Sequence, residues 1–159
     1  MFHQLQEADV FYGLDPDQLA RIQAICTQVT LEQDTVIFEE NSPGDELYIV
    51  IRGAVEVQVD PKTLGLDTDA EPTTIATLRQ GQVLGELVLV DQGLRSASAR
   101  VTTSKAQLFV IRRDDLISLC EQDYKLGYLI MRNIAAEMAF KIRGTDLIVR
   151  EQLLWRPRP

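Results

Sequence analysis

The hydrophobic pattern of the chain changes its period twice, and this limits the folds that it can adopt. Between Asp15 and Ile25, apolar residues recur at helical spacing behind a candidate N-cap and a proline at the first helical position. After Thr27 the pattern becomes alternating, with short apolar runs rich in β-branched residues. From Arg113 to about Leu154 helical spacing returns. The pattern predicts a helix, then strands, then helices.

The middle of the chain predicts short antiparallel strands. Turn signals occur at 42–45 (SPGD) and 52–53 (RG), and the polar stretch 60–72 predicts an exposed hairpin tip. We expect strands near residues 28–32, 35–39, 46–51, 54–59, 73–79, 98–103 and 106–111. Frequent turns between short strands favour a jelly-roll-like β-roll. The predicted fold class is therefore α+β, an antiparallel β-roll flanked by an N-terminal helix and C-terminal helices.

The length and composition fit a single domain. A chain of 159 residues can bury about two-thirds of its unfolded surface. With 45% hydrophobic and 25% charged residues, the chain is not typical of a disordered protein. We expect one domain over 1–159, with N-terminal helices at 1–27, the β-roll at 28–112 and C-terminal helices at 113–155.

Charge and apolar run length exclude some partners. The net charge of −8 repels the phosphates of DNA or RNA, so no nucleic-acid partner is expected. Apolar runs such as 47–51 and 87–90 are far shorter than the roughly 20 residues of a membrane helix. The N-terminus has no signal-peptide pattern, and we expect a cytoplasmic protein. Cys26 and Cys120 are far apart in the sequence and predict buried free thiols.

The last predicted helix carries an apolar seam that needs a cover. The seam consists of small and apolar residues spaced by three or four: Met131, Ala135, Met138, Ile142, Thr145 and Val149. It could pack on the domain's own roll or pair with a second copy across a two-fold axis. Further apolar residues on this helix favour the homodimer: Leu129, Ile130, Ile134, Leu147 and Ile148.

The segment from Gly81 to Val101, GQVLGELVLVDQGLRSASARV, carries the candidate chemistry. Gly85 lets successive N–H groups point into one concavity, and a short helix beginning at Glu86 would direct its positive end there. Arg95 adds a permanent charge whose forked donors suit two phosphate oxygens. This combination predicts an anion site.

Glu86 narrows the class of anion. A carboxylate beside an anion costs Coulomb energy unless it accepts a hydrogen bond from the ligand. A ribose phosphate meets this condition, because a 2′-hydroxyl can donate to Glu86 while the phosphate faces Arg95 and Ser96. The alternative is an ordinary surface ion pair between Glu86 and Arg95, worth at most about 1 kcal/mol.

The segment resembles the phosphate-binding cassette of the cyclic nucleotide-binding domain family. The family's Gly-Glu-Leu, followed about ten residues later by arginine and small residues, matches Gly85, Glu86, Leu87, Arg95, Ser96 and Ala97. The upstream run SPGDELYIVIRGAVEV is similar to the family's strand–turn–strand at Gly44, Asp45, Leu47, Tyr48 and Gly53. The resemblance extends over roughly residues 11–154.

The resemblance implies a regulatory sensor rather than an enzyme, with no cofactor and no metal. Its cassette, residues 84–98, would bind cyclic AMP or cyclic GMP while a C-terminal helix closes over the base. The implied ribose ligand is Glu86 and the implied phosphate ligand is Arg95, helped by N–H groups near Leu87 and Ala97. The implied pocket walls are Val57, Ile75 and Leu84. Thr145 would face the base, although packing on the apolar seam explains its position equally well.

Three departures from the family pattern bear on the ligand. Leu84 replaces an aromatic residue common before the glycine, and Leu94 replaces a proline common before the arginine. Ser96 stands where guanine-preferring members often have threonine, which favours cyclic AMP. The sequence does not identify the downstream protein effector. The alternatives are an interaction module that has lost nucleotide binding, or the regulatory domain of a larger signalling protein or channel.

The chain lacks the residues that other functions of this fold require. A DNA-binding relative needs a helix-turn-helix after the last helix, where the sequence has only WRPRP at 155–159. His3 and two scattered cysteines cannot ligate haem or an iron–sulfur cluster, and one histidine is too few for a β-roll metalloenzyme. The Asp114–Asp115 pair fits the N-terminus of a helix. We expect no catalytic residues and no metal site.

Overall fold

The helix predicted behind Asp15 is present, and two short helices precede it. The computed structural model describes residues 2–64, 71–91 and 93–154. The chain begins with α1 (Phe2–Gln6), the 3-10 helix η1 (Asp9–Phe11) and α2 (Pro16–Ile25). At the start of α2, the Asp15 side chain accepts from the Gln18 N–H and the Gln18 side chain accepts from the Asp15 N–H. This capping box fixes the first turn.

The strands form two antiparallel four-stranded sheets, which confirms the β-roll. One sheet has the order β1-β8-β3-β6 and the other β2-β7-β4-β5. The strands are β1 (Cys26–Glu32), β2 (Val36–Phe38), β3 (Glu46–Arg52), β4 (Val55–Val59), β5 (Thr73–Leu78), β6 (Val83–Leu84), β7 (Ser98–Val101) and β8 (Lys105–Arg112). All seven predicted strands are present. The two-residue strand β6 was not predicted, because it is too short to show an alternating pattern.

The connections also follow the predicted turns. β4 and β5 pair as an antiparallel hairpin whose tip begins with the 3-10 helix η2 (Pro61–Leu64), and residues 65–70 lie outside the described part of the structure. Gly53, between β3 and β4, has a φ of +88°, and a Cβ there would overlap the Lys105 carbonyl and the Thr103 hydroxyl. Only glycine fits this turn without strain.

Strand β3 joins the two parts of the hydrophobic core, because successive side chains point to opposite faces. Leu47, Ile49 and Ile51 pack in the cluster that also contains the helices. Tyr48 and Val50 pack in the second cluster, between the two sheets. Because both faces of β3 are buried, its sequence is a nearly continuous apolar run rather than an alternating pattern.

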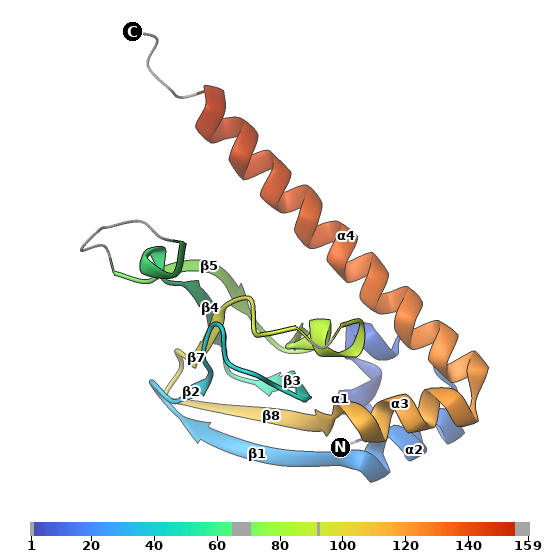
Figure 1. Ribbon diagram of the computed structural model, residues 1–159. Coiled ribbons are helices and arrows are strands. Elements are labelled where there is room, and N and C mark those ends of the chain that lie inside the picture. Colours follow the sequence, from blue (N-terminus) through green and yellow to red (C-terminus); the bar gives the residue numbers. More distant parts are fainter. Residues whose placement is uncertain (1, 65–70, 92, 155–159) are drawn as a thin grey trace, which may run out of the picture.

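Two helices complete the chain, α3 (Arg113–Gln122) and α4 (Tyr124–Leu154). Asp114 and Asp115 lie in the first turn of α3, as predicted. The helices gather beside one end of the roll, and α4 runs from this group past the roll and beyond it (Figure 1). No helix within the described ranges is long and apolar enough to cross a membrane.

The apolar seam of α4 is covered over only part of its length. Met131 and Met138 pack against the first core cluster, whereas Ala135 and Ile142 are exposed. Ile130 and Ile134, which we expected to supply surface for a second copy, are buried in the domain's own core. Leu147 is exposed, and the side chains of Thr145, Ile148 and Val149 lie outside the described part of the structure. The homodimer stays a prediction.

Both cysteines are free, but they are half-buried rather than buried. Cys26 begins β1, directly after the helical pattern at 15–25, while Cys120 lies in α3. Burial raises the pKa of Cys26 to about 12 and also raises the pKa of Cys120. Both thiols are therefore protonated at neutral pH and poorly reactive.

Asp123, between α3 and α4, ties three helices together. Its carboxylate accepts hydrogen bonds from the Leu126 N–H and the Gln18 side chain, and it forms an ion pair with Arg21 on α2. These donors, led by the Leu126 N–H, lower the pKa of Asp123 to about 2. The charged carboxylate therefore stabilises the helical layer.

Asp123→Asn is expected to lower the free energy of unfolding at pH 7, because asparagine removes the charge that these donors stabilise. The pKa of Asp123 is lowered on folding, so its contribution is full above the unfolded value of about 4 and is lost as the pH falls toward the folded value. Urea unfolding from pH 7 to pH 2.5 measures this difference. Glu121→Gln, at an exposed carboxylate of α3, is the control. A wild-type-to-mutant difference that does not shrink at low pH would contradict the assignment.

Candidate functional site

The cassette begins with a backbone turn that only glycine adopts easily. Gly85 has a φ of +75° and is the N-cap of the 3-10 helix η3 (Glu86–Leu89). This confirms the short helix predicted to begin at Glu86. A Cβ on Gly85 would overlap the Arg95 guanidinium and lie 3.0 Å from the Glu46 carbonyl oxygen. Glycine is thus needed both for its conformation and for the close approach of the arginine.

The Arg95 guanidinium is buried against main-chain carbonyls. The residue is only 6% exposed. Its Nη2 donates to the Glu46 carbonyl over 2.8 Å, and its Nη1 donates to the Gly85 carbonyl over 3.4 Å. The backbone of Arg95 also exchanges two hydrogen bonds with the 41–42 turn. One residue therefore joins the cassette to β3 and to the turn that precedes it.

One buried donor of the Arg95 guanidinium has no hydrogen-bond acceptor among the described residues. This donor is Nε, and within the described ranges no carboxylate lies at ion-pair distance. Burial lowers the pKa of Arg95, because desolvation disfavours the charged form. A buried cation held only by neutral groups favours an anion as a further partner.

Aromatic rings form one wall of the arginine site. The Arg95 guanidinium carbon lies 4.3 Å from the ring centre of Phe38 on β2 and 6.0 Å from that of Tyr48 on β3. The two rings are themselves 5.8 Å apart. Ring faces attract a cation, so this wall helps to hold the guanidinium when no anion compensates its charge.

Gly44 provides the space that the guanidinium occupies. A Cβ at this position would overlap the Nε and the central carbon of Arg95. The sequence predicted a turn at 42–45, and the structure adds the reason why the third residue of that turn is small.

Glu86 is buried and pairs with a lysine from α4. It is 6% exposed, and its Oε1 accepts from Lys141 Nζ over 2.6 Å. Lys141 also lies 3.1 Å from Glu137, one turn earlier on α4. Burial opposes the charge of Lys141, but the two carboxylates outweigh it and raise the pKa of the lysine. The alternative of a surface ion pair between Glu86 and Arg95 is therefore wrong.

The other predicted site residues occupy several environments. In the cassette, Ala97 is buried, while Leu87 and Ser96 are exposed. Leu84 is buried in the core between the sheets, and Val57 is half-buried beside it. Ile75 is exposed, and the side chain of Thr145 lies outside the described part of the structure. The roles expected for these residues in binding stay predictions.

Sequence reasoning missed four contributors to the site. Lys141 and Glu137 precede Thr145 by one and two turns of α4, so their shared helix face was a usable signal. Phe38 and the Glu46 carbonyl reach Arg95 from strands far away in the sequence, and no local pattern indicates such contacts. Among the described residues, no group of histidines, cysteines and carboxylates could hold a metal ion.

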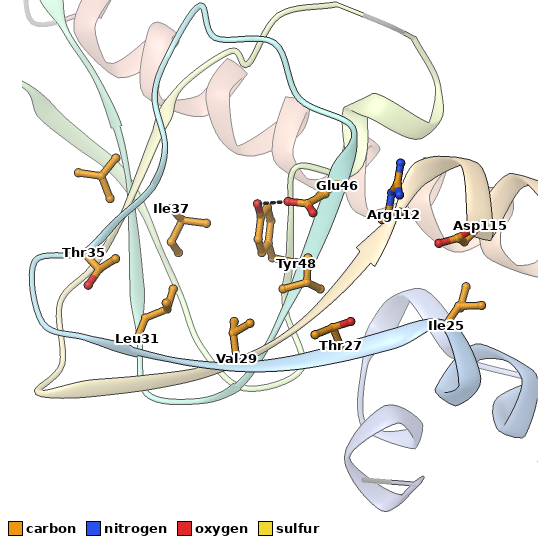
Figure 2. Close-up of a pocket in the computed structure, with 12 residues that line it drawn as sticks. Ile25, Thr27, Val29, Leu31, Thr35, Ile37, Glu46, Tyr48, Arg112 and Asp115 are labelled. Carbon is orange, nitrogen blue, oxygen red and sulfur yellow. Dashed lines mark hydrogen bonds between the residues drawn. The ribbon is translucent and has the colours of Figure 1, made fainter.

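A largely apolar pocket of about 410 Å³ is lined mainly by residues of β1, β2, β3 and β8 (Figure 2). Val29 and Leu31 of β1 and Ile37 of β2 line it, together with Glu46 and Tyr48 of β3. The Tyr48 hydroxyl donates to the Glu46 carboxylate over 2.7 Å (Figure 2). Glu46 and Tyr48 thus contact the pocket and Arg95 alike, whereas Glu86 and Arg95 do not line the pocket.

Comparisons with known proteins indicate the family of the chain. The family model described as "Cyclic nucleotide-binding domain" matches residues 28–123, more than half of the chain. The chain is 29% identical to the cyclic AMP receptor protein of Thermus thermophilus over 143 residues, covering 90% of this chain and 61% of that protein. It is 31% identical to glutaminase 1 of Bradyrhizobium diazoefficiens over 144 residues, covering 89% of this chain and 22% of that protein.

The fold matches solved structures as well. A cyclic nucleotide-binding domain from Methylobacillus flagellatus superimposes with a TM-score of 0.81 at 24% identity, covering 94% of this chain and 83% of that one. The chain spans less than two-thirds of the two curated relatives above. The structure places a cassette that begins at Gly85, with Glu86 and Arg95 both buried, on a β-roll. Together with the family match over residues 28–123, this shows that the chain belongs to the cyclic nucleotide-binding domain family.

Proposed function

We propose that this domain is a regulatory sensor that binds a cyclic nucleoside monophosphate at Glu86 and Arg95, and that it catalyses no reaction. The observation that carries the proposal is the buried Arg95 guanidinium, which has an unpartnered Nε and no carboxylate partner in the described residues. A phosphate oxygen is the acceptor that such a guanidinium favours. The name of the Thermus relative, cyclic AMP receptor protein, supports the same ligand class.

We expect Glu86 to recognise the ribose of the nucleotide, as Arg95 recognises its phosphate. Lys141 occupies Oε1 of the carboxylate. A carboxylate has about four acceptor positions, so Glu86 can accept from a 2′-hydroxyl while it keeps its bond to Lys141. The lysine charge also reduces the repulsion between Glu86 and a bound phosphate. We expect cyclic AMP to bind more tightly than cyclic GMP, because Ser96 stands where threonine favours guanine.

The wider setting of the domain is also a proposal. We infer a cytoplasmic location, which fits two thiols that remain free. The net charge of −8 argues against nucleic acid as a partner. We expect the domain to use neither a cofactor nor a membrane surface, and to signal to a protein effector. Because the chain spans 22% of the glutaminase relative, a regulatory role within a larger protein is the second candidate.

Isothermal titration calorimetry with cyclic AMP and cyclic GMP tests the ligand. We expect micromolar affinity for cyclic AMP, and a loss of roughly 100-fold or more in Arg95→Ala, since the phosphate loses its charge-assisted donors. Arg79→Ala removes an exposed arginine and is the control. If neither nucleotide binds the wild-type chain, the domain is an interaction module instead.

Gly44→Ala tests the position of the guanidinium without removing it. The added methyl group would overlap Arg95 and displace it from the Glu46 carbonyl, so we expect weaker binding and a loss of about 1–3 kcal/mol in stability. Gly144→Ala is the matched control, because a Cβ there meets no atom within 4 Å. The control should keep nucleotide affinity and gain up to about 1 kcal/mol of helix stability. Equal affinity in both variants would contradict the assigned role of Arg95.

We further propose that the ligand acts on α4 through Lys141. The Lys141–Glu86 contact links α4 to the carboxylate that the ribose would contact. A ligand that prefers one arrangement of this contact shifts the populations of α4. Saturating nucleotide should therefore change amide hydrogen exchange over 131–149 in the wild type, and the change should be smaller in Lys141→Gln. Identical exchange with and without nucleotide would rule out the coupling.

The exposed end of α4 is the proposed homodimer surface. Ile142 is 59% exposed, and Phe140 and Leu147 are also exposed on a helix that extends beyond the roll (Figure 1). Apolar side chains on such a helix favour pairing with a second copy. Sedimentation velocity should find a dimer that Ile142→Glu converts to monomer, while Arg143→Glu, at an adjacent exposed position, should disturb it less. A monomeric wild-type chain at high concentration would refute this interface.

A further inference from the structure

Glu137 shares one lysine with the glutamate assigned to the ribose. Lys141 Nζ lies 2.6 Å from Glu86 Oε1 and 3.1 Å from Glu137 Oε1. The side chains of Glu86 and Glu137 are 8% and 17% exposed, so water screens their interaction poorly. Two carboxylates and one ammonium leave this cluster with one net negative charge when all three groups are ionised.

Glu137 is the member of the cluster with an unsatisfied atom. Its Oε2 is buried and has no hydrogen-bond partner among the described residues. The charged groups that face it are Lys141 of its own helix, Glu86 of η3 and Asp9 of η1. Burial raises the pKa of Glu137, Lys141 opposes this shift, and the charges of Glu86 and Asp9 add to it. A proton on Glu137 would therefore relieve both desolvation and repulsion.

We propose that Glu137 tunes the affinity of the cassette for its nucleotide, weakening binding when it is ionised and strengthening it when it is protonated. The inference rests on the proposed function. A cyclic phosphate adds a negative charge to a site in which Arg95 and Lys141 face Glu86 and Glu137. With Glu137 neutral, the phosphate meets one carboxylate charge fewer. Glu137 is a positioning residue in this account, because it acts through Lys141 and through its charge and not by touching the ligand.

Linkage makes the proposal reciprocal. If the charge of Glu137 disfavours the ligand, the bound ligand must favour the proton on Glu137. Nucleotide binding should then take up protons from solution near the pH at which Glu137 titrates. A residue with only a structural role would change affinity without changing proton uptake.

Calorimetric titration of the full chain with cyclic AMP from pH 4.5 to 8.0 tests the inference. In the wild type the affinity should rise, by up to about tenfold, as the pH falls and Glu137 takes up its proton, because one negative charge near the phosphate is removed. Glu137→Gln should bind more tightly than the wild type at pH 8.0 and should show little dependence on pH. Glu121→Gln, at an exposed carboxylate of α3, should follow the wild type.

Three further measurements distinguish this effect from a local disturbance of the structure. Titrations in buffers of different ionisation enthalpy should detect proton uptake in the wild type and not in Glu137→Gln. Asp9→Asn should keep the pH dependence, because Asp9 only adds to the field at Glu137. Lys141→Gln should move the dependence to higher pH, since the cation that favours ionised Glu137 is lost.

The experiments distinguish a failure of the inference about Glu137 from a failure of the proposed function. If the wild type binds cyclic AMP but Glu137→Gln keeps the same pH dependence and proton uptake, the inference about Glu137 is wrong while the proposed function stands. If the wild type binds no cyclic nucleotide at any pH, the proposed function fails and this inference fails with it.

Discussion

The burial of the Arg95 guanidinium is the constraint on which the rest of the site depends. A cation with this little exposure needs acceptors, and the chain supplies main-chain carbonyls from Glu46 and Gly85. It also needs space, which explains glycine at both 44 and 85. The aromatic wall of Phe38 and Tyr48 completes the enclosure. The turn at 42–45, the start of β3 and the cassette are therefore organised around one side chain.

Local signals in the sequence were sufficient for most of the fold. The alternating runs and turn residues predicted seven strands, and Asp15 with Pro16 predicted the start of α2. Gly85 and Glu86 predicted a turn leading into a short helix, because both the conformation and the helix start depend on neighbouring residues. Strand β6 escaped prediction because its two residues carry no period.

The partners of the charged residues could not be predicted in the same way. Spacing suggested that Glu86 and Arg95 face each other, yet each has found other partners. Lys141 contacts Glu86 across 55 positions of the sequence, and Phe38 contacts Arg95 from strand β2. Such pairings follow from how α4 and β2 pack on the roll. Packing of this kind depends on the whole chain and leaves no local pattern.

Lys141 of α4 reduces the repulsion that an anionic ligand would meet at Glu86. From the sequence, Glu86 was a charge that repels an anion unless a ribose hydroxyl satisfies it. In the structure, Lys141 already compensates that charge, so a phosphate meets less repulsion than the isolated glutamate implies. The unsatisfied group lies instead one turn earlier on α4, at Glu137, whose second carboxylate oxygen has no partner among the described residues. The proposed ligand site and α4 thus share the same three side chains, as the proposed coupling of ligand binding to movement of this helix requires.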